Sequence, residues 1–333
     1  MIYIKNDSFD PKFNLALEEY VLKNFHNDTY FLLWQDNPTV VVGRNQNTIE
    51  EVNLDYANQN SINIVRRLSG GGAVYHDHGN LNFTFIVKDD SHKDKDFKTF
   101  TIPVIMALEK LGVKADFTGR NDITINGMKF SGNAQYHYKG YVLHHGTILY
   151  NSDLNIVANV LNVKKEKIES KGIKSIKSRV TNVYEHLQNK IDIATFKEFL
   201  KNYIFEYSNL HYKQHILTST DINNINEIMK SRYDTWEWTY GSSPAFTVRN
   251  TVKLPCGLFD LRINVLNGTI DNFRLYGDYF GIEDISELEE AFKGRRYDIY
   301  EIEDVVKSLD LSSYVSGITV DEFIDIIINK QPL

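Results

Sequence analysis

Residues 66–77 read Arg66-Arg67-Leu68-Ser69-Gly70-Gly71-Gly72-Ala73-Val74-Tyr75-His76-Asp77, and they follow an apolar, strand-like run from Ile62 to Val65. Glycine permits positive φ angles and lets backbone N–H groups approach a ligand, and successive N–H groups in such a turn form an anion-binding nest. The two arginines supply planar guanidinium groups that fit carboxylate or phosphate. The stretch therefore indicates an anion site, with a tight hairpin turn as the alternative explanation. It matches neither the Gly-x-Gly-x-x-Gly pattern of a Rossmann fold nor a P-loop.

The segments around this stretch predict a mixed α and β structure. Asp10 and Pro11 suit the N-cap and the first position of a helix, and apolar residues follow at helical spacing. A second helix is expected over residues 100–111, ended by Gly112. Short β-like runs cover residues 30–34, 39–43, 62–66 and 81–87. Apolar and polar residues alternate in the last run, which predicts a half-buried strand.

Residues 122–131 predict a β-hairpin with one polar face. Asn126-Gly127 between alternating runs is the strongest short signal for a two-residue type I′ turn. In that register the opposing pairs are Ile125 with Met128, Thr124 with Lys129, Ile123 with Phe130, and Asp122 with Ser131. The polar members of these pairs then share one face, which either is exposed to solvent or lines a site.

A second hairpin is expected to turn at Lys139-Gly140 and to return through residues 141–149. His144 and His145 are adjacent on the returning strand, so their side chains point to opposite faces and cannot both bind one metal ion there. At least one of the two is expected to be a hydrogen-bonding core residue.

At 333 residues the chain can bury one large core and a smaller second one. We expect a boundary near Phe246, which divides the chain into domains of residues 1–246 and 247–333. Residues 250–333 carry eight Lys and Arg against sixteen Asp and Glu, so the net charge of −7 is concentrated there. A solvated acidic surface explains this charge, and the chain lacks the broad basic face that nucleic-acid binding requires.

The composition is that of a globular protein, with 42% hydrophobic and 13% aromatic residues. The single cysteine, Cys256, excludes an intramolecular disulfide and suits a reducing compartment. The first residues do not resemble a signal peptide, and the apolar runs are too short to span a bilayer. The sequence thus predicts a soluble, cytoplasmic protein without membrane contact.

Taken in their order along the chain, several segments resemble those of lipoate–protein ligase A. They are Gly43–Asn47, Arg66–Asp77 with Gly79–Asn82, Gly119–Asp122, Lys129–Gly132, His144–Thr147, Lys171–Asn182, and Trp236–Trp238 with Pro244–Phe246. Each segment alone is only suggestive, whereas their order and spacing together are specific. The resemblance covers essentially the whole chain.

The resemblance implies the α+β fold of the biotin and lipoate protein ligases. That fold has a large catalytic domain of mixed, hairpin-rich sheets flanked by helices, and a small α+β C-terminal accessory domain that rotates away after the first step. The implied reaction uses ATP, Mg²⁺ and lipoate to form lipoyl-adenylate and pyrophosphate. The amino group of an acceptor lysine then attacks the adenylate and releases AMP. The implied acceptors are lipoyl domains of 2-oxoacid dehydrogenases and the glycine-cleavage H protein.

The resemblance also assigns site residues. Lys129 matches the family's essential lysine, expected to contact the lipoate carboxyl and the α-phosphate as an electrostatic clamp. Asp122 is a candidate Mg²⁺ ligand, or simply the partner of Lys129. The loop residues Lys174, Lys177, Ser178 and Arg179 are expected to cover the adenylate, an exposed connector being the alternative. The residues expected to bind ATP or lipoyl-adenylate are Arg66, Arg67, Ser69, Gly70, Gly71, Gly72, Ala73, Val74, Tyr75, His76, Asn80, Asn121, Asp122, Ser131, His145, Gly146 and Thr147.

The nearest alternative is a lipoyl- or octanoyl-transferase of the same fold, which needs no ATP. Some of those use a cysteine nucleophile, but Cys256 lies far from the glycine turn and is better explained as a buried structural residue. A transferase that accepts preformed lipoyl-adenylate remains open, as does a non-catalytic lipoate-binding module. A biotin ligase would carry a Gly-Arg-Gly-Arg-x-Gly loop, from which Arg66–Gly72 departs.

Overall fold

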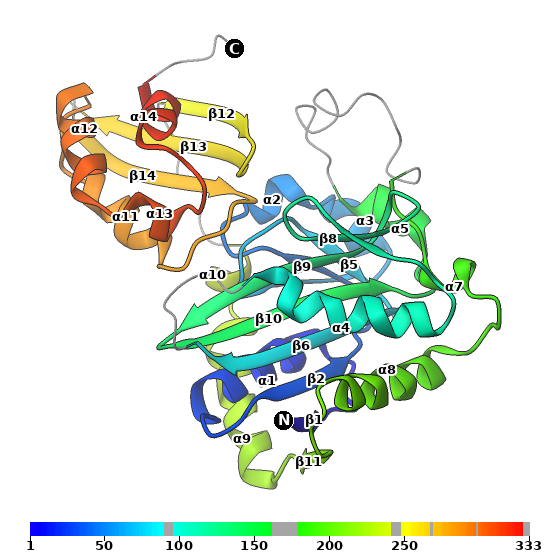
Figure 1. Cartoon of the computed structure of the whole chain (residues 1–333). Coiled ribbons are helices and arrows are strands. Elements are labelled where there is room, and N and C mark those ends of the chain that lie inside the picture. Colours follow the sequence, from blue (N-terminus) through cyan, green and yellow to red (C-terminus); the bar gives the residue numbers. More distant parts are fainter. Residues whose placement is uncertain (90–95, 162–178, 241–247, 267–268, 298, 329–333) are drawn as a thin grey trace.

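The computed structural model of the chain describes residues 1–89, 96–161, 179–240, 248–266, 269–297 and 299–328 (Figure 1). Within these residues the strands form one eight-stranded sheet and two three-stranded sheets. The large sheet and one small sheet come from the first 240 residues. The other small sheet comes from residues 248–277 and packs with its own helices at one end of the molecule.

The large sheet is mixed, and hairpins build its second half. Its order is β11 (Lys213–Ile216), β1 (Ile2–Lys5), β2 (Tyr30–Trp34), β6 (Asn80–Lys88), β10 (Tyr141–Leu149), β9 (Met128–Tyr138), β8 (Asp122–Ile125) and β7 (Asp116–Thr118). Strand β1 pairs in parallel with β11 and β2, and the other neighbours are antiparallel. The predicted turn at Lys139-Gly140 is confirmed between β9 and β10.

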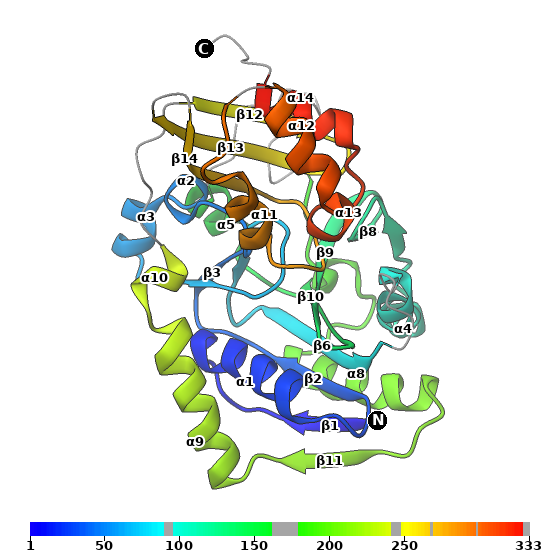
Figure 2. The ribbon, with the colours of Figure 1, turned by 90° about the vertical axis from the view of Figure 1, so that its left-hand side faces the viewer.

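Helices cover both faces of the large sheet (Figure 2). Helices α1 (Pro11–Asn24) and α9 (Ser219–Ile228) pack on one face, and α4 (Phe97–Lys110) and α8 (Ile193–Tyr207) pack on the other. The predicted start of α1 is confirmed, because the Asp10 side chain accepts hydrogen bonds from the N–H groups of Lys12 and Phe13. None of the helices in the described ranges is both long and apolar enough to cross a membrane.

Strand β6 corrects one prediction. The alternating pattern of residues 81–87 predicted a half-buried strand, but residues 80–86 are buried on both faces. The cause is the central position of β6 between β2 and β10, with a helical layer on each side. Its polar residues are accommodated by hydrogen bonds: Thr84 donates to Glu18 of α1, and Trp34 donates to Thr84. Alternation indicates a solvated face only when nothing else covers that face.

The first small sheet carries the two arginines and the glycine turn. Its order is β4 (Asn63–Arg66), β3 (Thr39–Val42) and β5 (Val74–His76), and the turn connects β4 to β5. The helices α2 (Thr48–Glu51), α3 (Leu54–Gln59) and α5 (Leu154–Val160) lie beside it. The remaining elements of this part are α7 (Val183–His186), the π-helix η2 (Met229–Tyr233) and α10 (Trp236–Thr239).

The C-terminal part has a core of its own. It contains the antiparallel strands β12 (Val248–Leu254), β13 (Gly257–Leu266) and β14 (Thr269–Gly277), followed by α11 (Ile285–Phe292), α12 (Ile299–Ser308), α13 (Leu311–Tyr314) and α14 (Val320–Ile328). Phe273 and Phe292 stack at its centre, with ring centroids 4.3 Å apart. The sequence predicts strands over residues 259–265 and 269–276 and helices over residues 285–292 and 319–328, and β13, β14, α11 and α14 confirm them; α12 and α13 were not anticipated. The predicted boundary near Phe246 lies outside the described residues.

Candidate active site

Lys129 is positioned by the hairpin of β8 and β9. Asn126 and Gly127 both have positive φ, 52° and 77°, which confirms the predicted type I′ turn and the opposition of Thr124 and Lys129. The Nζ atom of Lys129 lies 2.7 Å from Oδ1 of Asp122. Both side chains remain more than one third exposed, at 38% and 36%, so a ligand can reach this ion pair.

The predicted pairs Ile123–Phe130 and Asp122–Ser131 are wrong. A bulge shifts the register so that Ile123 lies opposite Ser131 and Asp122 opposite Gly132. The extra residue of β9 at the bulge is Phe130, and both Ile123 and Phe130 are fully buried. Bulges add local twist, and with this one both Ile123 and Phe130 pack in the core although they are no longer paired.

Two further contacts fix Lys129. Its backbone N–H donates to the carbonyl of Arg179 at 2.7 Å, and its carbonyl accepts from the N–H of Thr181 at 2.9 Å. Gly132 leaves room for its side chain, because a Cβ at that position would lie 2.9 Å from Nζ. Of the four residues expected in the covering loop, Arg179 lies here, and Lys174, Lys177 and Ser178 lie outside the described residues.

Arg67 shapes the glycine turn. Its side chain is buried and donates to Oγ of Ser69 and to the carbonyls of Val41, Gly70 and Gly72. Burial, helped by repulsion from the neighbouring Arg66, lowers the pKa of Arg67 to about 10, so the group stays charged at neutral pH. Gly71 has a φ of 89°, a conformation that favours glycine. The guanidinium thus holds the turn from within.

Arg66 was expected to bind the ligand, but its side chain is bonded to other parts of the protein instead. Its guanidinium donates to six oxygen atoms of the protein, those of Gly43, Arg44, Gln46, Thr48, Trp238 and Thr239. The indole of Trp238 in turn donates to the Arg66 carbonyl at 2.8 Å. These bonds connect Arg66, at the end of β4, to residues 43–48, which precede it in the chain, and to α10, which follows it.

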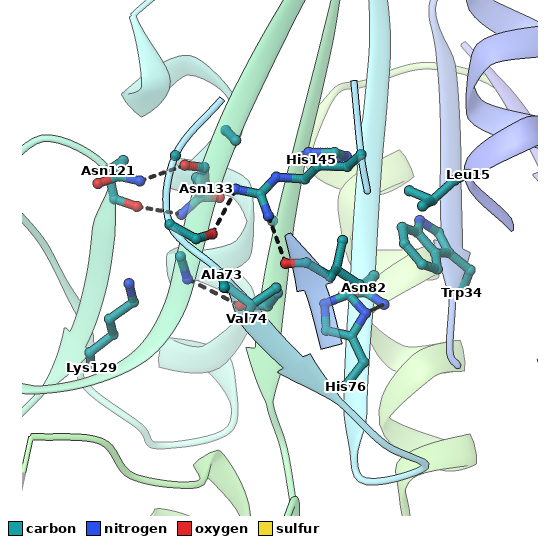
Figure 3. A pocket seen from close by; sticks show the side chains of 18 residues that line it. Leu15, Trp34, Ala73, Val74, His76, Asn82, Asn121, Lys129, Asn133 and His145 are labelled. Carbon is teal, nitrogen blue, oxygen red and sulfur yellow. Dashed lines mark hydrogen bonds between the residues drawn. The ribbon is translucent and has the colours of Figure 1, made fainter. Parts of the chain in front are cut away.

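A small cavity of about 90 Å³ begins beside Lys129 and runs under the glycine turn (Figure 3). Figure 3 shows Lys129 at the opposite side of the cavity from Leu15 and Trp34. Its apolar lining includes Leu15, Trp34, Val41 and Ala134, and its polar lining includes His76 and His145. The cavity thus combines apolar and polar lining residues, and Lys129 lies at one side of it.

Buried acids stand behind the two histidines of this cavity. Glu18 lies 3.1 Å from Nδ1 of His145, and Asp36 lies 2.7 Å from Nδ1 of His76. Burial raises the pKa of Asp36, against the lowering effect of the His76 contact. Sequence analysis missed both acids, as well as Leu15 and Trp34. The burial of Glu18 follows from the layers packed around α1, whose residues 14–22 are all buried, and not from a signal in the sequence.

His144 points to the other face of β10, as predicted. Its ring stacks on Phe100 at 4.5 Å and also packs against Phe83. Burial lowers its pKa well below the ordinary value, so it is a neutral core residue at neutral pH. The expectation that one of the two histidines belongs to the core is confirmed for His144.

A larger cavity of about 580 Å³ opens on the other side of Lys129. Its lining carries more charged side chains than that of the small cavity, among them Arg120, Asp122, Arg179, Lys253 and Asp278. The two cavities share seven lining residues: Gly72, Ala73, Val74, Asn121, Lys129, Gly132 and Thr147. Lys129 and the glycine turn therefore lie where an apolar site meets a larger, charged one.

The structure brings most of the predicted site residues together at these cavities. Besides the shared residues, the small cavity is lined by the predicted residues Arg67, Gly71, His76, His145 and Gly146. The large cavity is lined by the predicted residues Tyr75, Asp122, Ser131 and Arg179. Arg66, Ser69, Gly70 and Asn80 line neither of these two cavities.

Residues 10–205 match the family model of the lipoyl protein ligase A/B catalytic domain. Residues 243–327 match that of the bacterial lipoate protein ligase C-terminus. The chain belongs to the lipoyl protein ligase A/B family. Bacillus subtilis lipoate-protein ligase LplJ is 46% identical over 330 residues, which cover 98% of this chain and 100% of that protein. Staphylococcus aureus lipoate–protein ligase 1 is 43% identical over 326 residues, with coverage of 97% and 99%.

Solved structures of lipoate ligases share the fold. P. falciparum LipL1 in complex with lipoate is 27% identical, with a TM-score of 0.81 and coverage of 98% of this chain and 97% of that one. A lipoate-protein ligase A bound with ATP is 26% identical, with a TM-score of 0.64 and coverage of 72% and 98%. The predicted family and the predicted α+β fold class are thereby confirmed.

Proposed function

We propose that this chain is an ATP-dependent lipoate–protein ligase, which joins lipoate to an acceptor lysine by way of lipoyl-adenylate. The observation that carries the proposal is the meeting of the two cavities at Lys129. The narrow apolar cavity suits an extended acyl chain whose carboxylate ends at the lysine. The large cavity, lined by several charged groups, suits a nucleoside triphosphate. Relatives support both ligands, since one solved ligase is in complex with lipoate and another is bound with ATP.

In the first step, a carboxylate oxygen of lipoate attacks the α-phosphorus of ATP, and the bond to the bridging oxygen of pyrophosphate breaks. Two anions must approach each other, so their repulsion has to be neutralised. The ammonium group of Lys129 lies between the two cavities and would contact both the carboxylate and the α-phosphate. Its existing partner, Asp122, is accessible to solvent, and such exposed pairs are weak enough to be replaced by a ligand.

In the second step, the amino group of an acceptor lysine attacks the lipoyl carbonyl carbon, and AMP leaves. Negative charge develops on the carbonyl oxygen and on the departing phosphate, again beside Lys129. The lysine acts as a fixed positive charge in both steps and forms no bond to the acyl group.

The glycine turn would bind the nucleotide through its backbone. Gly72, Ala73 and Val74 line both cavities, and Tyr75 lines the large one. Arg67 holds the turn in shape through its bonds to the carbonyls of Gly70 and Gly72, so its part in nucleotide binding is to position N–H groups.

Mg²⁺ fits the large cavity as a partner of the phosphates. In the described part of the chain, no group of three or more His, Cys, Asp and Glu side chains is placed to hold a metal. Magnesium in nucleotide enzymes usually keeps several waters and takes only one or two carboxylates. We propose Asp122 as such a ligand. The bound ion would neutralise phosphate charge during adenylation.

We propose lipoyl domains of 2-oxoacid dehydrogenases and the glycine-cleavage H protein as acceptors. A bipartite archaeal ligase from Thermoplasma acidophilum, solved in a study with its E2 lipoyl domain, supports the first class; it is 29% identical with a TM-score of 0.66, covering 74% of this chain and 98% of that one. We further propose that residues 1–246 form the catalytic domain and residues 247–333 an accessory domain. A cytoplasmic location stays a prediction.

The test is pyrophosphate release from ATP and Mg²⁺ with lipoate, followed by addition of an apo H protein. Lipoate-dependent release and a lipoyl mass increment on the acceptor are expected. If release is absent but supplied lipoyl-adenylate modifies the acceptor, the chain is a transferase instead. Binding of lipoate without either reaction would indicate a non-catalytic module. The thioester route has no support, because Cys256 is buried, burial raises the pKa of its thiol, and it lines neither cavity.

A further inference from the structure

One part of the wall of the large cavity belongs to the C-terminal part of the chain. Lys253, Leu254 and Pro255, at the end of β12, line it together with Asp278, which follows β14. This wall is fastened to the rest of the protein. The N–H of Gly277 donates to the carbonyl of Asn45 at 2.6 Å, and Arg44 pairs with Asp284.

The lining of the large cavity is positively charged, whereas the C-terminal part that supplies part of its wall is acidic. Among the described residues, the lining has four cations, Arg120, Lys129, Arg179 and Lys253, and two carboxylates, Asp122 and Asp278, which gives these residues a net charge of plus two. Residues 250–333 as a whole carry twice as many acidic as basic side chains. A lysine at this cavity is therefore an exception in an acidic domain, and a positive cavity attracts a polyanion.

Arg120 and Lys253 have different roles in this wall. The Arg120 guanidinium donates to the carbonyls of Cys256 and Asp278 and lies 4.4 Å from the ring centroid of Phe280. It thus serves to hold the wall in place. The Lys253 ammonium lies 3.8 Å from Oδ1 of Asp278, and that oxygen already accepts from the N–H of Leu258 at 2.5 Å. About a third of the Lys253 side chain is exposed, so a ligand in the cavity can reach it.

We propose that Lys253 contacts the β- and γ-phosphates of ATP and favours the departure of pyrophosphate. The inference rests on the proposed function and deepens it. Lys129, at the junction of the cavities, is placed for the α-phosphate and the carboxylate. The phosphates beyond it would extend into the large cavity, where Lys253 of the C-terminal part supplies a further positive charge. The charge on the leaving group increases as the bond between the α-phosphorus and the bridging oxygen breaks, and a nearby ammonium stabilises that charge.

This placement separates the two half-reactions. Adenylation needs the β- and γ-phosphates, whereas transfer from lipoyl-adenylate involves neither. Lys253 therefore acts in the first step only, unlike Lys129, which acts in both.

The test compares the full-length chain with Lys253→Met, Lys253→Arg and Lys293→Met. Lys293 is a matched control, since it is an exposed lysine of the same domain, 3.7 Å from Glu290, and lines neither cavity. Isothermal titration with ATP and with AMP, each with Mg²⁺, measures binding. We expect Lys253→Met to raise the Kd for ATP by about tenfold, as loss of one charge-assisted contact predicts, and to leave the Kd for AMP unchanged. Lys253→Arg restores most of the ATP affinity, and Lys293→Met has no effect.

Activity gives a second readout. Lipoate-dependent pyrophosphate release should fall in Lys253→Met, while transfer from supplied lipoyl-adenylate to apo H protein keeps its wild-type rate. Unchanged ATP binding, or an equal loss of ATP and AMP binding, overturns the inference. An equal loss in both half-reactions overturns it as well. If the wild-type chain binds ATP but releases no pyrophosphate, the ligase activity fails, and the titration still decides whether Lys253 contacts the outer phosphates.

Discussion

Glu18 of α1 accepts a hydrogen bond from Nδ1 of His145 on β10, 3.1 Å away. A carboxylate accepts hydrogen bonds, so Nδ1 carries a proton here, and Nε2 on the other side of the ring shares a hydrogen bond with the Ser69 hydroxyl at 2.6 Å. The Ser69 oxygen accepts from Nε of Arg67 at 3.0 Å. One chain of hydrogen bonds thus runs from the helix, through a residue of the small cavity, to the glycine turn.

These linked hydrogen bonds predict both a structural and a functional effect of Glu18→Ala. The substitution leaves Nδ1 of His145 and the hydroxyl of Thr84 without their acceptor inside the protein. We expect the free energy of unfolding to fall by about 3 kcal/mol and the KM for lipoate to rise, because His145 lines the small cavity. Urea unfolding and pyrophosphate release measure the two effects. Glu303→Ala, at an exposed ion pair on α12, is the control; equal stability of the two variants would contradict the assignment.

Two glycines beside the cavities should respond differently to alanine. A Cβ on Gly132 would lie 2.9 Å from Nζ of Lys129, at the end of a flexible side chain, so the lysine moves at little cost. A Cβ on Gly146 would lie 2.2 Å from Oδ1 of Asn133 and 2.4 Å from the Phe83 ring. We expect Gly132→Ala to lower kcat without changing the melting temperature, and Gly146→Ala to cost about 1–3 kcal/mol of unfolding free energy. Thermal unfolding and steady-state kinetics of the two variants test these expectations. A Gly132→Ala variant that is destabilised but has a normal kcat would contradict the argument from packing.

Local signals in the sequence were enough for the parts of the fold that depend on local physics. The Asn126-Gly127 turn, the Asp10 cap of α1 and the opposite faces of His144 and His145 each follow from neighbouring residues, and each is confirmed. The bulge at Phe130 could not be foreseen in this way, because it depends on how two hydrophobic side chains meet a core built from distant segments.

The site shows the same limit. The glycine turn and Lys129 were identified from the residues and the family resemblance, and the structure places both beside the cavities. The role of Arg66 could not be read from the sequence, because its partners lie up to 173 positions away in the chain. Glu18 and Asp36 were missed because acidic side chains are usually exposed to solvent. These two are buried only because helices and strands from distant parts of the sequence pack around them.

Lys129→Ala should abolish catalysis while preserving the fold. Its ion pair with Asp122 is accessible to solvent, so its loss costs about 1 kcal/mol of stability or less. Among the described residues, Lys129 is the only charged side chain that lines both cavities, and its removal should slow both half-reactions by about 10²-fold or more. Pyrophosphate release and transfer from supplied lipoyl-adenylate measure the two steps separately. Wild-type rates in a variant with a native melting curve would exclude Lys129 from the mechanism.

Asp221 provides a prediction for the dependence of stability on pH. Burial opposes its ionisation, but hydrogen bonds from Tyr20, Thr218 and His215 outweigh burial and lower its pKa to about 2. A carboxyl whose pKa is lower in the folded state stabilises the protein fully above its unfolded pKa of about 4, and this contribution disappears as the pH falls toward 2. Asp221→Asn should therefore lower the free energy of unfolding by about 1–3 kcal/mol at pH 7, and by less at pH 3. Urea titrations at the two pH values test this, and a difference from wild type that grows on acidification would show that the carboxylate is not the stabilising form.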